Sequence, residues 1–183
     1  MSRVGIFLAD GFEEIEGLTV VDILRRAGID ISMISINGKK KVTGAHGIAL
    51  DTDEDIVQCD PDKLDMLVLP GGMPGTTNLA ACEKLTDALK KADQEKRGIA
   101  AICAAPSVLG DLGFLKGKKA VCYPGFESRL TGAEVLAVPV VTDGHITTSR
   151  GMGTAIAFAL ELTKRLKDEE TAKQVGRSII YNV

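Results

Sequence analysis

The sequence has few histidines and no closely spaced cysteines. It has two histidines, far apart along the chain, and no two of its four cysteines form a CxxC pair. Zinc sites and disulfide frameworks depend on such local spacings. We therefore expect no metal site and no disulfide scaffold, and no segment predicts a bound cofactor. The cysteines are Cys59, Cys82, Cys103 and Cys122.

Excess positive charge and long apolar runs are also missing. The net charge is −3 at pH 7, so the sequence offers no basic footprint for nucleic acid. Several acidic residues interrupt the beginning of the chain, which a secretory signal does not tolerate. The longest charge-free stretch, 66–82, is broken by prolines and glycines and does not predict a membrane helix. We expect a cytoplasmic protein with neither a nucleic-acid nor a membrane partner.

What the sequence does have is a regular alternation of strand and helix signals. Short, nearly continuous apolar runs are typical of strands that are covered on both faces. Such strands are predicted at 3–9, 30–36, 65–70 and 98–103. After the first of them, apolar residues recur at helical spacing until Gly28, a typical helix stop. Further strands are predicted at 118–124, 135–143 and 145–150, and a hairpin or a pair of edge strands at 41–51. Helices are predicted at 83–96, from 105 onward and at 153–167.

This alternation predicts an α/β fold with a doubly wound, mainly parallel sheet. There is no internal repeat and no linker, so we expect residues 1–183 to form a single domain. Ligands of such sheets bind beyond the carboxyl ends of the strands. The loops 9–16, 70–75 and 103–106 all follow predicted strands, and together they form the candidate site.

Cys103 lies in the segment AAICAAPSVLG, where a buried strand gives way to a helix. Its apolar neighbours fit a small, buried core residue. Its place at a strand–turn–helix junction equally fits a nucleophile elbow, which exposes the side chain at the turn. The following helix N-terminus would favour the thiolate over the thiol. The residues alone leave both interpretations open.

Two glycines at the end of another strand carry groups that would serve such a nucleophile. Gly71 and Gly72 let the backbone approach a ligand closely and leave N–H groups free. An oxyanion formed by attack of Cys103 would accept hydrogen bonds from the N–H groups of Gly72 and Ala104. On its own, however, a proline–glycine–glycine segment is usually a turn.

Three glutamates begin the first helix. Glu13 and Glu14 fit an ordinary interaction with the helix macrodipole. Glu16 is surrounded in the sequence by small or apolar residues, a setting that favours the protonated carboxyl group. A protonated carboxyl donates a hydrogen bond to a thiolate and so lowers the pKa of the thiol.

Five segments, DGFEEIE, DILRRAGI, VLPGG, AAICAAP and TSRGMGTA, occur in the order seen in the ThiJ/PfpI superfamily. The chain most resembles the parkinsonism-associated deglycase branch and its close bacterial members, and the resemblance covers essentially the whole chain. It implies a flavodoxin-like, three-layer α/β/α sandwich that forms a homodimer.

The resemblance also implies roles for particular residues. Cys103 matches the family's reactive cysteine and Glu16 its protonated glutamate. The backbone oxyanion donors match Gly72 and Ala104. Arg26 falls where the family has a dimer-interface arginine near the site. His46 falls where some members have a second arginine.

Three positions depart from patterns found in the family. Tyr123 stands where some members have a histidine near the cysteine, so that position offers no Cys–His dyad. Ala104 stands where the protease-like members have a histidine, which argues against proteolysis. Met152 replaces a usual proline, with no evident functional consequence.

The sequence therefore predicts cysteine-dependent detoxification of reactive carbonyls. In this hypothesis Cys103 attacks glyoxal, methylglyoxal or a glycated adduct derived from them, as in a glyoxalase III-type enzyme or a deglycase, and Glu16 shuttles protons. The alternative is an oxidative-stress sensor or protective chaperone in which Cys103 is oxidised to a sulfinate without turnover.

Overall fold

A central sheet organises residues 2–181, the part of the chain that the computed structural model describes. Within these residues the sheet has seven strands in the order β10-β11-β7-β6-β1-β2-β5. Neighbouring strands are parallel except for the β10–β11 pair. The strands are β1 (Arg3–Leu8), β2 (Asp30–Ser35), β5 (Glu54–Asp55), β6 (Met66–Leu69), β7 (Gly98–Ile102), β10 (Val140–Asp143) and β11 (Ile146–Ser149). The predicted doubly wound, mainly parallel sheet is confirmed.

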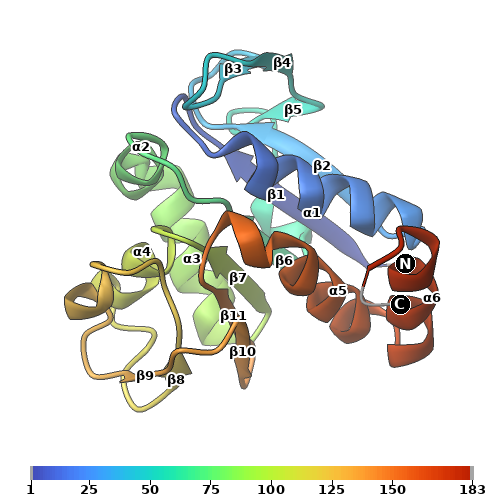
Figure 1. Cartoon of the computed structure of the whole chain (residues 1–183). Coiled ribbons are helices and arrows are strands. Elements are labelled where there is room, and N and C mark those ends of the chain that lie inside the picture. The colour runs from blue at the N-terminus through green and yellow to red at the C-terminus, as the bar shows by residue number, and fades with distance from the viewer. Residues whose placement is uncertain (1, 182–183) are drawn as a thin grey trace.

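Helices cover both faces of this sheet, as Figure 1 shows. One face carries α1 (Glu14–Arg26), α5 (Ala155–Leu166) and α6 (Glu169–Ser178). The other face carries α2 (Gly75–Ala81), α3 (Glu83–Glu95) and α4 (Pro106–Asp111). The result is the three-layer α/β/α sandwich of flavodoxin-like folds. None of the helices within residues 2–181 is both long and apolar enough to span a bilayer.

The two cores arise from the alternation of side chains along each strand. In β1, Ile6 and Leu8 pack toward α1 and α5, whereas Phe7 packs toward α3. In β6, Val68 faces the core beneath α1 and α5, and Leu69 faces the core beneath α3. All five side chains are fully buried, which explains why these strands read as unbroken apolar runs.

Smaller elements lie at the margins of the sheet. The predicted hairpin is confirmed as β3 (Lys41–Thr43) paired antiparallel with β4 (Ala49–Asp51). A separate two-stranded parallel sheet joins β8 (Lys119–Ala120) to β9 (Glu134–Val135). The 3-10 turns are η1 (Pro61–Lys63), η2 (Glu127–Arg129) and η3 (Met152–Thr154).

Three expectations need correction. The strand predicted at 118–124 is reduced to β8, because Val121 N donates to Thr148 Oγ1 and Tyr123 N to Cys103 O instead of joining a ladder. The strand predicted at 135–143 is divided between β9 and β10, with Pro139, which has no N–H donor, between them. The helix α2 was not expected, because its sequence GTTNLAA is short and begins within a glycine-rich loop.

The carboxyl ends of β1, β6 and β7 lie side by side, because these three strands are neighbours in the sheet. The loops that follow them are joined directly. Glu13 N donates to Gly71 O at 2.9 Å, and Gly75 N donates to Gly11 O at 3.1 Å. The fold thus brings together the three loops predicted to form the site.

Candidate active site

Cys103 occupies a sharp turn between β7 and α4. Its φ angle is +66°, in the left-handed region that non-glycine residues rarely adopt. The turn is held on both sides, since Cys103 N donates to Ser149 O at 3.0 Å and Tyr123 N donates to Cys103 O at 2.8 Å. The side chain is half-buried, so the thiol is accessible without being freely solvated. This is the backbone geometry of a nucleophile elbow.

Glu16 reaches the same point from the first turn of α1. Its side chain is 1% exposed, and its Oε2 accepts a hydrogen bond from Gly71 N at 2.9 Å. The carboxyl group also lies beside the Cys103 side chain, whose interaction with it opposes the rise in the pKa of Glu16. The helix beginning at Glu14 therefore places a buried carboxyl beside the thiol.

Glycine is required where the β6 loop passes the thiol. A Cβ atom on Gly71 would lie 2.5 Å from Cys103 Cβ and 2.7 Å from Glu16 Oε2. Gly72 has a φ angle of +90°, and a Cβ atom there would overlap Glu13 N. Only a chain without side chains at these positions leaves room for the Glu16–Cys103 contact.

Backbone N–H groups converge on the sulfur. The N–H groups of Gly72 and Ala104 both lie near Cys103 Sγ and favour its charged form. The Ala104 carbonyl points away and accepts from Ser107 Oγ at 2.7 Å. Two N–H donors at one reactive atom are the arrangement that stabilises an oxyanion during acyl or carbonyl chemistry.

The thiol and the carboxyl are electrostatically coupled. Burial raises the pKa of Glu16 to about 7, although hydrogen bonds from Cys103 and Gly71 oppose the shift. Burial, together with the negative charge of an ionised Glu16, raises the pKa of Cys103 to about 12. The two groups therefore do not ionise together near neutral pH, and the pair holds one proton that lies on either the carboxyl or the sulfur.

Tyr123 and Gly151 border the pair on its open side. The Tyr123 side chain is 50% exposed. A Cβ atom on Gly151 would lie 3.2 Å from Tyr123 Cδ2 and 4.0 Å from Glu16 Oε1. Gly151 and Ser149 were not predicted as site residues, although both lie in the TSRGMGTA segment, which resembles the family pattern.

The hairpin loop between β3 and β4 is bonded to α1 through Glu14 rather than through Glu16. Glu14 Oε1 accepts from His46 N at 2.8 Å, and its Oε2 lies 3.0 Å from His46 Nδ1. Burial would raise the pKa of Glu14, but the hydrogen bonds from His46 and Ile48 outweigh it and lower the pKa. Glu14 thus does more than complement the helix dipole.

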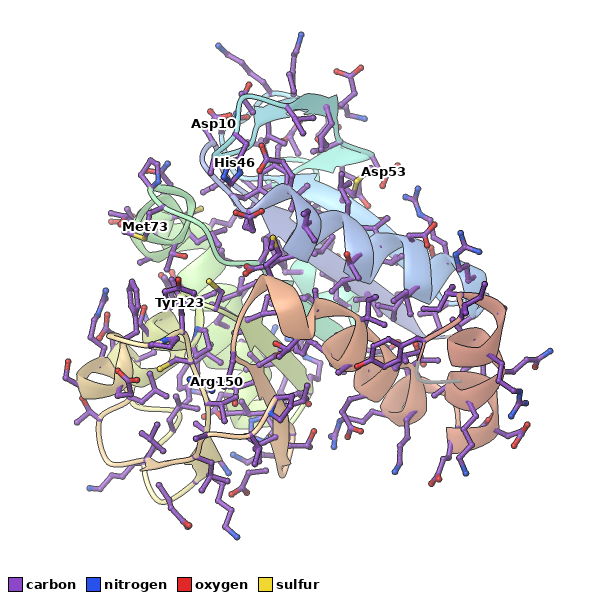
Figure 2. The ribbon with its side chains drawn as sticks, viewed as in Figure 1. Asp10, His46, Asp53, Met73, Tyr123 and Arg150 are labelled. Atoms are coloured by element: carbon purple, nitrogen blue, oxygen red, sulfur yellow. The ribbon has the colours of Figure 1, made fainter. Side chains whose placement is uncertain are left out.

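His46 and Arg26 are not brought to the thiol within this chain. The exposed His46 ring, labelled in Figure 2, contacts Glu14 and lies 3.6 Å from Glu13 Oε2, and these carboxylates raise its pKa. Arg26 pairs with Asp22 at 2.6 Å in the last turn of α1. It lies ten residues beyond Glu16, which corresponds to about 15 Å along a helix.

The described residues contain one cluster with potential metal ligands. Atoms of Glu13, Glu14 and His46 lie within 4.8 Å of one another. The hydrogen bond between His46 and Glu14 already accounts for this arrangement, so the cluster supports no metal assignment.

Known proteins resemble this chain over nearly its whole length. Protein dj-1beta of Drosophila melanogaster is 36% identical over 97% of this chain and 97% of the fly protein. A Pyrococcus abyssi protein named as a deglycase is 33% identical over 90% of the chain and 99% of its own length. Protein DJ-1 homolog B of Arabidopsis thaliana is 37% identical over 97% of the chain, but the chain spans only 41% of the plant protein.

The solved structure of oxidized Toxoplasma gondii DJ-1 matches with a TM-score of 0.96 at 34% identity, and the match covers 100% of both chains. The model of the DJ-1/PfpI family matches residues 2–165. Since the family model and full-length relatives cover nearly all of it, the chain belongs to the DJ-1/PfpI family.

Proposed function

We propose that the protein is an enzyme that converts small reactive carbonyl compounds, with Cys103 as the nucleophile and Glu16 as the proton shuttle. One observation carries the proposal: the strained Cys103 elbow places Sγ against both a buried carboxyl and two backbone N–H donors. A core cysteine needs none of these groups. Ala104 rather than histidine follows the cysteine, so proton transfer falls to Glu16.

The chemistry balances with methylglyoxal and water alone. The Cys103 thiolate attacks the aldehyde carbon, and the resulting oxyanion accepts hydrogen bonds from Gly72 and Ala104 before it takes a proton from Glu16. Glu16 then removes the C1 hydrogen as a proton and returns a proton to C2, while the hydroxyl proton on the C1 oxygen passes to the C2 oxygen, so that C1 is oxidised to a thioester and C2 is reduced to an alcohol. The thioester that results is hydrolysed by water, which gives lactate and restores the thiol.

Glycated adducts are the second substrate class that this site fits. Here the sulfur attacks a carbon derived from the dicarbonyl, and Glu16 donates a proton to the departing amine. The Pyrococcus relative that is named a deglycase supports this assignment. Both reactions use the same thiol, carboxyl and N–H groups.

Turnover of methylglyoxal to D- or L-lactate tests the proposal. The variants Cys103→Ala and Glu16→Gln should each lose at least about 100-fold in kcat/KM, the scale of a lost nucleophile or general acid–base group. Cys82→Ala, which removes another partly exposed thiol, serves as the control and should retain activity. Wild-type turnover no faster than that of Cys103→Ala would refute the proposal.

A second candidate function is peroxide sensing. Glu16, Gly72 and Ala104 surround Sγ with groups that would hold the oxygens of a sulfinate, and the Toxoplasma relative was solved in an oxidized form. Two peroxide molecules would each transfer one oxygen to the sulfur and leave as water. Peptide mapping after mild peroxide should then find two added oxygens on Cys103 before any appear on Cys59, Cys82 or Cys122. Uniform oxidation of all four would exclude this function.

We also propose that two copies of the chain form a homodimer through the outer face of α1. Ile15 and Leu18 are 51% and 38% exposed on successive turns of this helix. Leu18 also borders a shallow groove shared with Ile156 and Ile179. An exposed apolar strip beside the active site is typical of a subunit interface.

A further inference from the structure

A groove of about 460 Å³ adjoins the candidate active site. Tyr123 and Gly151 belong to both, since they line the groove and also border the Cys103–Glu16 pair. In the view of Figure 2, Tyr123 lies between the Met73 loop and Arg150. The groove therefore meets the candidate active site at Tyr123 and Gly151, and Arg150 is another of its lining residues.

Backbone hydrogen bonds fix both walls of this groove relative to the thiol. Tyr123 N donates to Cys103 O at 2.8 Å, and Cys103 N donates to Ser149 O at 3.0 Å. Arg150 follows Ser149 directly, and its own N–H donates to Pro139 O at 3.2 Å. A ligand atom bonded to the sulfur and a second group near Arg150 would thus be held at a defined separation.

The lining of the groove is mostly apolar. Pro124, Pro139, Met152 and the Tyr123 ring supply carbon surface. Among the lining residues of the described chain, Arg150 is the one charged side chain. Within residues 2–181 no carboxylate forms an ion pair with it. Arg150 is a partly buried residue, and its guanidinium, at the border of a mostly apolar groove, is suited to a ligand carboxylate, which its planar fork binds in a bidentate manner.

We propose that this groove is the second half of the substrate site and that it binds a carboxylate on a short alkyl chain. The inference rests on the proposed carbonyl chemistry at Cys103 and specifies its substrate class. The substrate is an α-oxoaldehyde, or an adduct derived from one, whose carboxylate pairs with Arg150 while its carbonyl reacts with Cys103. Glyoxal and methylglyoxal carry no such group and leave the groove unfilled.

Turnover of 4,5-dioxopentanoate and of its methyl ester tests the assignment, because the two compounds differ mainly in charge. The wild-type protein should prefer the acid over the ester in kcat/KM by about 10- to 100-fold, the range for a charge-assisted hydrogen-bonded pair. Arg150→Gln should bring this preference close to one. Arg129→Gln is the matched control, because Arg129 is an exposed arginine that already pairs with Asp111. Equal wild-type rates for acid and ester, or equal effects of the two variants, would overturn the inference.

Alkylation of Cys103 separates this inference from the proposed function. The probes are N-(iodoacetyl)glycine and its uncharged amide, and peptide mapping identifies the modified cysteine. Faster modification by the acid in the wild type but not in Arg150→Gln supports the anion-binding groove even where neither oxoaldehyde is turned over, and in that case only the catalytic function fails. Turnover without any preference for charge in either assay rejects the groove and leaves the catalytic function standing.

Discussion

At the scale of single residues, the shared proton of Cys103 and Glu16 sets the reactivity of the site. The pair loses its first proton near pH 7, where burial has placed the pKa of Glu16, and the second is released only near pH 12. Between these values a fraction of molecules has the proton on the carboxyl and the charge on the sulfur. The rate of Cys103 alkylation should therefore rise through pH 7 and then level off.

Glu16→Gln removes the group that titrates near pH 7. The alkylation rate of this variant should lose the inflection near pH 7 and rise only above about pH 8.5, the value of a free thiol, because burial still disfavours the thiolate. Rates of iodoacetamide modification measured between pH 5 and pH 10 check this. An unchanged profile in the variant would show that Glu16 does not control the thiol.

Contacts between residues that are distant in the sequence were harder to predict than the positions of residues near strand ends. Cys103 and Glu16 could be placed because Cys103 directly follows β7 and Glu16 lies in the first turn of the helix after β1, so that the chain direction fixes their side of the sheet. The bond from His46 to Glu14 was not, because it joins a hairpin to a helix 32 positions away. Arg26 was expected near the site, but within one chain its position on α1 places it a helix length away.

At the scale of elements, Glu14 fastens the β3–β4 hairpin to α1. Its carboxylate accepts the N–H groups of His46 and Ile48, and no side chain at position 44 would fit, because a Cβ atom on Gly44 would overlap the same carboxyl group. Glu14→Ala should lower the free energy of unfolding by about 1–3 kcal/mol, the cost of leaving such groups unpaired. Hydrogen exchange at 44–48 should accelerate. Glu14→Gln keeps an acceptor oxygen and should recover part of the protection; equal exchange in all three proteins would contradict this role.

The inner strands β1, β6 and β7 were predictable because they are buried on both faces and form apolar runs, whereas the edge strand β5, with the sequence Glu54–Asp55, was not predicted. The segment 118–124 gives the same signal for a different reason. Val121 and Cys122 are buried, but the backbone there bonds to Thr148 Oγ1 and Cys103 O. An apolar sequence indicates burial but does not indicate which group each backbone N–H bonds to. The apolar pattern of 118–124 therefore could not show that this segment supports the Cys103 turn instead of forming a full strand.

At the scale of the whole molecule, the buried Glu16 makes stability depend on pH. Its pKa is about 7 in the folded protein and near 4.5 in the unfolded chain. The stabilisation that comes from keeping Glu16 protonated is therefore complete below pH 4.5 and is lost as pH rises through 7. For a pKa shift of this size, the free energy of unfolding falls by about 3 kcal/mol. The raised pKa of Cys103 acts only above pH 9 and does not enter this window.

Urea denaturation of the wild type and of Glu16→Gln at pH 4 and pH 8 checks this dependence. The stability of the variant relative to the wild type should improve by about 3 kcal/mol between the two values, because glutamine has no charge to bury. The difference isolates Glu16 from the carboxylates whose pKa is lowered, such as Glu14. Glu134→Gln, at an exposed position, should show no comparable change. If the difference in the free energy of unfolding between variant and wild type is the same at both pH values, burial does not raise the pKa of Glu16.

Assembly is the other property of the whole molecule that the exposed residues predict. Ile15 and Leu18 on α1 and Ile48 in the hairpin loop are all exposed apolar residues, and this loop is bonded to the first turn of α1. Leu18→Glu would place a charge within a self-complementary interface and should shift the protein from dimer to monomer in sedimentation experiments. Val57→Glu is the matched control, because Val57 is 72% exposed and lies beyond β5, at the far edge of the sheet. A wild type that sediments as a monomer, or a dimer that Leu18→Glu leaves intact, would exclude this interface. Arg26, on the same helix, would then have no route to a partner subunit's active site.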